Sequence, residues 1–392
     1  MFDPRKILRQ VSIPLLHEFF RRRGELQELP WTELKARTGF SRIWSAWQQL
    51  PARARREVQV QLREVSDLAD NGMRAIAEAL RTHHPDRLWE LKACGNRLNR
   101  ALWFHLHFPD LFAQSSLFAQ ADGLSTGRYA VRRNTLPKRP IAVTSAVTTA
   151  LGSALRDYYW SQEMRGEECR VEHYTRPDGN EYFFAYLDDW PDAPLAFADD
   201  GNLGPLPARY AFSVLFVFCP QDGSLELVAK GGQAIHFPLQ QAFCRSVLGI
   251  DVEPADPLRP VYDLNMLLDP NFTFPTDPSD HVAAVRLARI NVAPQNAVAG
   301  VTGGGLDFGA DLGRRQSLEK IQGLLALIEA PRDQATVTEA AIEFRFLPWG
   351  VERAGRTTVN IWPPNRCDLK DKPDQVQVVI DRCFKAWGIL CA

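Results

Sequence analysis

The stretch between residues 210 and 249 constrains the fold of this chain more than any other. Residues 212–218 are almost all aliphatic or aromatic, which is typical of a strand that is buried on both faces. Asp222-Gly223 supplies the positive φ of a tight hairpin turn, and residues 225–229 form a half-buried return arm. An apolar stripe at helical spacing follows. We therefore predict a strand, a turn, a strand and a helix, with Val217 in the core.

The length of the chain predicts more than one hydrophobic core. The chain has 392 residues, and its composition, 45% hydrophobic and 24% charged, is ordinary for a globular protein. Amphipathic helices dominate its beginning, whereas hairpin patterns follow residue 141. We expect an α+β fold with a helical domain over 1–110, a basic linker over 111–140, and a domain of antiparallel β-hairpins with packed helices over 141–392.

Three further patterns make specific structural predictions. Residues 53–83 carry one amphipathic stripe and predict a single long helix. Residues 302–306 are glycine-rich, but no Gly-Lys-Ser/Thr follows them, so they predict a flexible loop and no phosphate cradle. The segments 211–249 and 337–388 share the order strand, strand, helix. We expect these two segments to pack their hairpins into one sheet with both helices on the same face, because an isolated two-stranded ribbon is marginal in water.

Neither a membrane segment nor a disulfide framework is apparent in the sequence. The apolar runs have strand length, and the first residues lack the basic region and apolar block of a signal peptide. The seven cysteines are scattered, and no two have CxxC spacing. We expect a cytoplasmic protein without a membrane partner.

The charges are distributed unevenly along the chain. Residues 1–140 hold 24 Lys and Arg against 14 Asp and Glu, a net charge of +10, and the remainder holds 22 against 33, a net charge of −11. A basic half is typical of nucleic-acid binding. The alternative is that the two halves attract each other or an oppositely charged subunit.

Three segments supply candidate nucleic-acid contacts. An arginine triplet ends the helix predicted over residues 5–24, where cations also suit the helix dipole. Residues 31–50 have a helix-turn-helix outline in which Ser41 can cap the second helix. In a DNA-reading unit of this kind, the residues that face the DNA groove would be Ser41, Arg42, Ser45 and Gln49. The alternative is an ordinary corner between two helices of a helical domain. The basic residues of 121–140 indicate either an arm that contacts phosphates or a solvated linker. The candidate residues are Arg21, Arg22, Arg23, Arg42, Gln49, Arg128, Arg132, Arg133, Lys138 and Arg139.

The sequence carries no complete catalytic motif. Cys169 and His173 lie four residues apart on a predicted strand, a separation of about 13 Å, so they cannot form a nucleophile pair. A metal-dependent nuclease would need an acidic residue followed by Glu-x-Lys across a hairpin. Neither Asp178 with Glu181 nor Asp222 with Glu226 is followed by that lysine. We predict no cofactor and no metal site.

These observations favour a non-enzymatic function. We expect a cytosolic subunit that binds DNA or RNA, protein, or both within a larger bacterial assembly. Antiviral genome-defence or mobile-element machinery is one such setting. The alternative is an atypical metal-dependent nuclease or hydrolase with acidic residues in the hairpins at 169–226.

Overall fold

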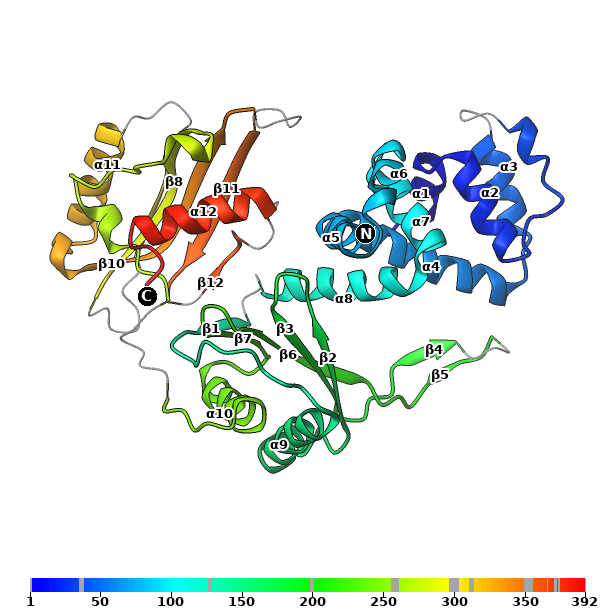
Figure 1. The fold of residues 1–392 in the computed structure, drawn as a ribbon, viewed down its shortest axis with the longest axis horizontal. Coiled ribbons are helices and arrows are strands. Elements are labelled where there is room, and N and C mark those ends of the chain that lie inside the picture. Colours follow the sequence, from blue (N-terminus) through cyan, green and yellow to red (C-terminus); the bar gives the residue numbers. More distant parts are fainter. Residues whose placement is uncertain are drawn as a thin grey trace. The chain divides into compact units, whose positions relative to one another are not determined.

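The computed structural model of the chain forms two compact units, Met1–Gly123 and Leu124–Ala392. It describes residues 2–34, 39–125, 129–197, 201–254, 261–295, 303–309, 314–348, 355–364, 366–369, 372 and 374–391. Within these ranges helices build the first unit and three antiparallel sheets with packed helices build the second, which confirms the α+β class (Figure 1). No helix of the described residues is long and apolar enough to cross a membrane.

The first unit is entirely helical in its described residues. The core lies between α4 and α7, where Leu62, Val65, Leu102 and Phe104 are fully buried. Short 3₁₀ turns lie at Trp31–Glu33 and Pro85–Arg87. The helices are α1 (Pro4–Gln10), α2 (Ile13–Arg22), α3 (Gly39–Gln48), α4 (Ala52–Asn71), α5 (Met73–His83), α6 (Leu88–Ala93), α7 (Arg97–His107) and α8 (Pro109–Ser125).

The prediction of a single helix over residues 53–83 is wrong, because the structure has two helices that meet at Gly72. The backbone of Gly72 leaves the helical region, with φ −113° and ψ 13°, while its N–H still bonds the Leu68 carbonyl at 2.7 Å. A side chain at Gly72 would begin 2.1 Å from Leu68 Cδ1. Glycine therefore lets α4 end and α5 begin within one residue, although the apolar stripe continues across the break.

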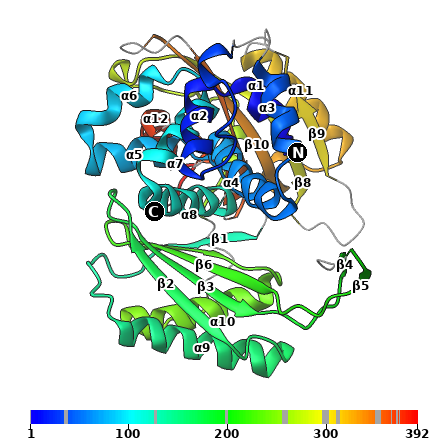
Figure 2. The ribbon, with the colours of Figure 1, turned by 90° about the vertical axis from the view of Figure 1, so that its right-hand side faces the viewer.

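The first sheet of the second unit confirms the hairpin predicted around residue 222. Gly223 takes φ +68° in the turn, and Val217 is only 3% exposed. The neighbouring helices α9 (Ser145–Glu163) and α10 (Gln233–Phe243) lie on one face of the sheet (Figure 2). The strand order is β1-β7-β6-β3-β2, and the strands are β1 (Ala130–Arg133), β2 (Cys169–Thr175), β3 (Glu181–Asp188), β6 (Ala211–Cys219) and β7 (Ser224–Val228).

A small ribbon interrupts the connection between β3 and β6. Strands β4 (Leu195–Phe197) and β5 (Leu203–Pro205) pair only with each other among the described residues. We call residues 190–197 and 201–210 the arm, because they extend away from the first sheet in both views (Figures 1 and 2).

The second sheet has its own core and does not contain β6 or β7. Helices α11 (Arg314–Leu327) and α12 (Asp374–Ala386) pack against it, and 3₁₀ turns lie at Asn265–Leu268, Pro278–Asp280 and Arg332–Gln334. Its strand order is β12-β11-β10-β8-β9. The strands are β8 (Val282–Pro294), β9 (Gly304–Asp307), β10 (Ala335–Phe346), β11 (Gly355–Trp362) and β12 (Arg366–Cys367).

The prediction that the two hairpins share one sheet is therefore wrong. Strand β6 pairs with β3, whereas β10 pairs with β8 along nearly its whole length. Each hairpin thus finds a third strand from the segment that precedes it in the chain. A third strand and a helical cover already bury the apolar face that a lone hairpin leaves open.

The glycine-rich segment also differs from its prediction. Gly304 and Gly305 belong to β9, which pairs with β8, so these residues do not form a loop. A Cβ at Gly304 would lie 2.2 Å from Leu324 Cδ1 of α11, and one at Gly305 would lie 2.2 Å from Asn291 Oδ1. Glycine here permits close approach of an edge strand to its neighbours. Thr302 lies outside the described residues.

Candidate nucleic-acid interface

Helix α1 presents three cations to solvent. Arg5, Lys6 and Arg9 are exposed, while Ile7 and Leu8 between them are buried in the core of the first unit. Because Arg5 and Arg9 are four residues apart, they lie on the same side of the helix. Asp3 caps α1 and accepts a hydrogen bond of 2.9 Å from the Arg5 amide, which fixes the start of the helix.

Helix α3 lies beside these cations and offers aromatic rings to them. The Arg5 guanidinium lies 4.7 Å from the centroid of the Trp44 ring, and the Arg9 guanidinium lies 4.6 Å from that of Phe40. The two rings stack on each other, with centroids 6.3 Å apart and planes inclined by 23°. Both rings are half-buried. The two arginines therefore cover a pair of parallel aromatic side chains.

The outward side of α3 and the residue that follows the helix carry the polar residues that the sequence singled out. Ser41, Arg42, Ser45 and Gln49 are exposed, whereas Trp47 is 3% exposed and belongs to the core. Neither α1 nor α3 contains an aspartate or a glutamate. We call Arg5, Lys6, Arg9, Phe40 and Trp44, together with the outward Arg42, the α1–α3 surface. Arg42 lies about 160° around α3 from Trp44, so it extends this surface across the outward side of the helix.

At the beginning of α3, Ser41 does not take the capping position that the sequence predicted, while the helix-turn-helix outline itself stays a prediction. Residues Trp31–Glu33 form only a 3₁₀ turn, and 35–38 lie outside the described residues. Because α3 begins at Gly39, Ser41 lies in its first turn and does not cap it. A Cβ at Gly39 would lie 3.1 Å from both Ile13 Cδ1 and Leu34 Cβ, so glycine permits the close packing of α3 against its neighbours.

Two members of the arginine triplet make contacts within the first unit, although the Arg22 side chain is still 42% exposed. Arg22 donates to the Leu106 carbonyl and pairs with Glu18, one turn earlier on α2. Arg21 is exposed, and the structure shows no side-chain partner for it among the described residues. Within the triplet, Arg21 is thus the member whose guanidinium is most available for a ligand.

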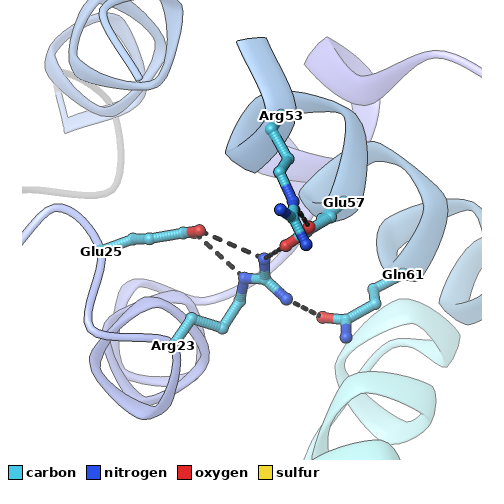
Figure 3. A network of polar contacts seen from close by, with 5 residues as sticks. All are labelled: Arg23, Glu25, Arg53, Glu57 and Gln61. Atoms are coloured by element: carbon cyan, nitrogen blue, oxygen red, sulfur yellow. Dashed lines mark hydrogen bonds and ion pairs between the residues drawn. The ribbon is translucent and has the colours of Figure 1, made fainter. Parts of the chain in front are cut away.

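Arg23 forms the centre of a polar network between α2 and α4 (Figure 3). Its guanidinium pairs with Glu25 at 3.0 Å and with Glu57 at 3.3 Å, and it donates to Gln61 Oε1 at 2.8 Å. A hydrogen bond from Arg53 lowers the pKa of Glu57, and Arg23 lowers it further. The Arg23 side chain is only 16% exposed. Its contacts therefore join two helices of the fold.

The basic segment expected to form an arm or a linker is partly built into the first sheet. Residues 130–133 are strand β1, which pairs with β7. Arg132 pairs with Asp222 at 3.0 Å, Arg133 donates to the Glu253 carbonyl at 2.7 Å, and Arg139 donates to the Leu248 carbonyl at 2.8 Å. Lys138 remains exposed. Arg128 lies outside the described residues.

The acidic residues of the alternative site are occupied by local partners. Glu181 Oε2 lies 2.7 Å from His173 Nε2 and accepts a hydrogen bond from Thr175. Asp222 pairs with Arg132, and Asp178 bonds the backbone and side chain of Asn180. Across the described part of the chain, no three His, Cys, Asp or Glu side chains gather in an arrangement that could hold a metal ion.

Comparison with known proteins found no matching family model and no similar curated sequence. The candidate site is therefore defined by its own residues. Sequence reasoning found Arg42 and Gln49 but missed Arg5 and Arg9, which complete the surface. The sequence did indicate that Arg5 and Arg9 lie together on an exposed helix face, since they are four residues apart on a helix whose other face is apolar. The sequence did not indicate that the Phe40 and Trp44 rings would lie beneath these two arginines.

Proposed function

We propose that this chain is a non-enzymatic binding subunit that contacts nucleic-acid phosphates through the α1–α3 surface. The observation that carries the proposal is the set of four exposed cations, Arg5, Lys6, Arg9 and Arg42, on two adjacent helices that include no aspartate or glutamate beyond the capping Asp3. Uncompensated cations of this kind attract the phosphate backbone, because binding releases condensed counterions.

The aromatic rings of the α1–α3 surface favour a nucleic acid over a simple anion. Arginine guanidinium groups are planar and bind phosphate with two donors while they stack on rings. Trp44 and Phe40 are half-buried beneath Arg5 and Arg9, so a base that displaces a guanidinium would meet a ring already in place. Arg42 and Ser45 on the outward side of α3, and Gln49 just after the helix, provide further donors.

The setting that we propose is a larger bacterial assembly in the cytoplasm, such as genome-defence or mobile-element machinery. The charge of the first unit supports a nucleic-acid partner, since residues 1–123 hold 19 Lys and Arg against 14 Asp and Glu, a net charge of +5. The net charge of the other residues is opposite in sign and suits a protein partner that is basic.

The test measures how salt affects binding. Fluorescence anisotropy of labelled duplex DNA, single-stranded DNA and RNA is recorded with the full chain between 50 and 200 mM salt. Each lost phosphate contact makes the slope of log K against log salt shallower by about 0.7–0.9. We therefore expect the triple variant Arg5→Gln, Arg9→Gln, Arg42→Gln to bind more weakly, with a slope shallower by about 2–3.

The control variant changes the same number of charges elsewhere. Arg53, Arg63 and Arg170 are 88%, 70% and 80% exposed, and each pairs with a neighbouring carboxylate. Replacing these three by glutamine should leave the slope nearly unchanged. Equal loss in both variants, or no salt-sensitive binding by the wild type, would refute the proposed interface. Strand cleavage in the presence of Mg²⁺ or Mn²⁺ would refute the non-enzymatic assignment and support the nuclease alternative.

A further inference from the structure

Helices α11 and α12 cover one face of the second sheet, and we call the opposite face the polar face. On β10, Phe344 belongs to the core that these helices bury. Successive side chains of a strand point to opposite faces, so Glu343 and Arg345 lie on the polar face. Arg286 of β8 and Arg356 of β11 lie on it too, because they are the register partners of Glu343 and Arg345.

Two arginines oppose each other directly on the polar face, and we call Arg345 and Arg356 the arginine pair. Directly opposed residues have Cβ atoms about 4.5–5.5 Å apart, and like charges in this position destabilise a sheet. The Arg345 side chain is 37% exposed and Arg356 is exposed, so both guanidinium groups can reach a ligand from solvent. The pairing thus costs the hairpin stability that an anion between the two groups would restore.

The carboxylate beside the arginine pair, Glu343, is already bound by Arg286. Arg286 donates to both carboxylate oxygens, at 2.9 and 2.8 Å. Arg345 Nε lies 3.3 Å from one of the same oxygens, and Arg356 forms no hydrogen bond or ion pair with the described residues. The hydrogen bond from Arg286 is the main cause that lowers the pKa of Glu343, so this group stays ionised. Three arginines against one glutamate leave a net charge of +2 here.

The β8–β9 side of the same sheet shows an arginine whose charge is compensated. Arg289 pairs with Asp307 at 2.7 Å and lies 3.7 Å from Glu339. Asn291 also donates to Glu339, at 2.8 Å. The sheet thus supplies Arg289 with two carboxylates, whereas its described residues supply the arginine pair and Arg286 with one shared carboxylate.

We propose that the arginine pair binds a phosphate monoester on the polar face of the second sheet. Such a group carries a charge of about −1.5 to −2 at pH 7, which matches the net charge of the site. A carboxylate or a phosphodiester carries a single charge and would leave part of the excess uncompensated. Each guanidinium fork can donate twice to phosphate oxygens. Thr358, two residues after Arg356 on β11, adds a hydroxyl on the same face.

Hydrogen exchange of the full chain, with and without adenosine 5′-monophosphate at constant ionic strength, tests the site. Peptides that cover β10 and β11 report on the hairpin, and peptides of β3 and β6 serve as the reference. A ligand that binds only the closed hairpin slows its exchange in proportion to ligand concentration over Kd, about tenfold at ten times the Kd. Arg356→Gln removes one guanidinium fork and should raise the Kd at least about 10-fold.

The same variant gives a second readout without ligand. Because Arg356→Gln removes a like charge opposite Arg345, its hairpin should exchange no faster than that of the wild type. Arg289→Gln is the matched control on the same sheet, and it should keep the response to the nucleotide. Three results overturn the proposal: no response of β10 and β11 in the wild type, an equal response in Arg356→Gln, or faster exchange of that variant without ligand.

Further ligands identify the molecule that carries the phosphate, because a mononucleotide and the 5′ end of a nucleic-acid strand both present a monoester. An oligonucleotide with a 5′-phosphate is compared with the same strand ending in a 5′-hydroxyl. A larger effect of the 5′-phosphate strand than of the nucleotide assigns the site to strand ends, and the reverse assigns it to nucleotides. Adenosine should have no effect, and an effect equal to that of its monophosphate overturns the proposal. The α1–α3 surface belongs to the first unit, so its own test is independent of this one.

Discussion

Phe243 offers the sharpest test of how the second unit is held together. It lies at the end of α10 and is fully buried against the first sheet. Its ring centroid lies 5.3 Å from that of Phe183, 5.1 Å from that of Phe216 and 6.2 Å from that of Phe218. These three rings come from β3 and β6, so one side chain connects a helix to the central strand of the sheet and to its neighbour. We expect Phe243→Ala to destabilise this sheet selectively.

The expected magnitude follows from the burial of the ring. Truncating a buried phenylalanine to alanine costs about 3–5 kcal/mol, including the cavity that remains. Phe243→Leu keeps most of the apolar volume and loses chiefly the ring contacts, so it should cost no more than about 1.5 kcal/mol. The difference between the two variants separates cavity formation from the loss of aromatic geometry.

Hydrogen exchange followed by mass spectrometry is the suitable assay, because two units need not unfold in one step. Peptides that cover β3 and β6 report the opening of the first sheet, and peptides from β8 and β10 serve as an internal reference. A factor of ten in exchange rate corresponds to about 1.4 kcal/mol. Phe243→Ala should therefore accelerate the slowest amides of β3 and β6 on the order of 10²- to 10³-fold.

Two results would contradict this reasoning. Acceleration below about fivefold would mean that Phe243 contributes little despite its burial, or that the sheet repacks around the gap. Equal acceleration of β8 and β10 would mean that the two sheets open together. The second result would show that the separate clusters of buried residues around the two sheets form one cooperative unit.

Three further substitutions have defined expectations. Gly223→Ala should destabilise the second unit by at least about 1–2 kcal/mol, measured by urea denaturation, because φ is +68° and the new Cβ would lie 2.1 Å from the Leu136 carbonyl oxygen. Gly323→Ala should instead stabilise it by about 0.5–1 kcal/mol, since Gly323 lies within α11 and a Cβ there meets no atom within 4 Å; a loss of stability would contradict the helix. Arg23→Gln should lower the stability of the first unit by about 1–2 kcal/mol, whereas Arg21→Gln should change it by less than about 0.5 kcal/mol. Equal thermal unfolding of these two arginine variants would mean that the network of Figure 3 is not stabilising.

Local patterns predicted the elements that depend on neighbouring residues. The hairpin at β6 and β7 follows from an apolar run and an Asp222-Gly223 turn, all within about twenty residues. Local patterns did not predict which third strand each hairpin would pair with. Strand β6 pairs with β3 and β10 pairs with β8, and nothing in either hairpin specifies which strand it will meet. Apolar periodicity shows that a face is buried, but not which segment buries it.

The partners of the arginine side chains were likewise not predictable from local sequence. Arg23 meets Glu57, 34 residues away, and Arg132 meets Asp222, 90 residues away. Arg133 bonds a carbonyl 120 residues away. From the sequence alone, these three arginines could not be distinguished from Arg42 as candidates for phosphate binding. Their hydrogen-bond and ion-pair partners are distant in the sequence, and only the fold brings them near. Composition counts charges, whereas binding depends on which charges remain uncompensated.

This distinction changes what the uneven charge of the chain implies. The balance of +10 over residues 1–140 includes Arg132, Arg133 and Arg139, and the structure ties all three to groups of the second unit. The balance that remains in residues 1–123 is +5, and four exposed cations of that unit lie on the α1–α3 surface. Four cations make at most about four phosphate contacts, so the affinity should be moderate and the slope of log K against log salt should be no steeper than about −4.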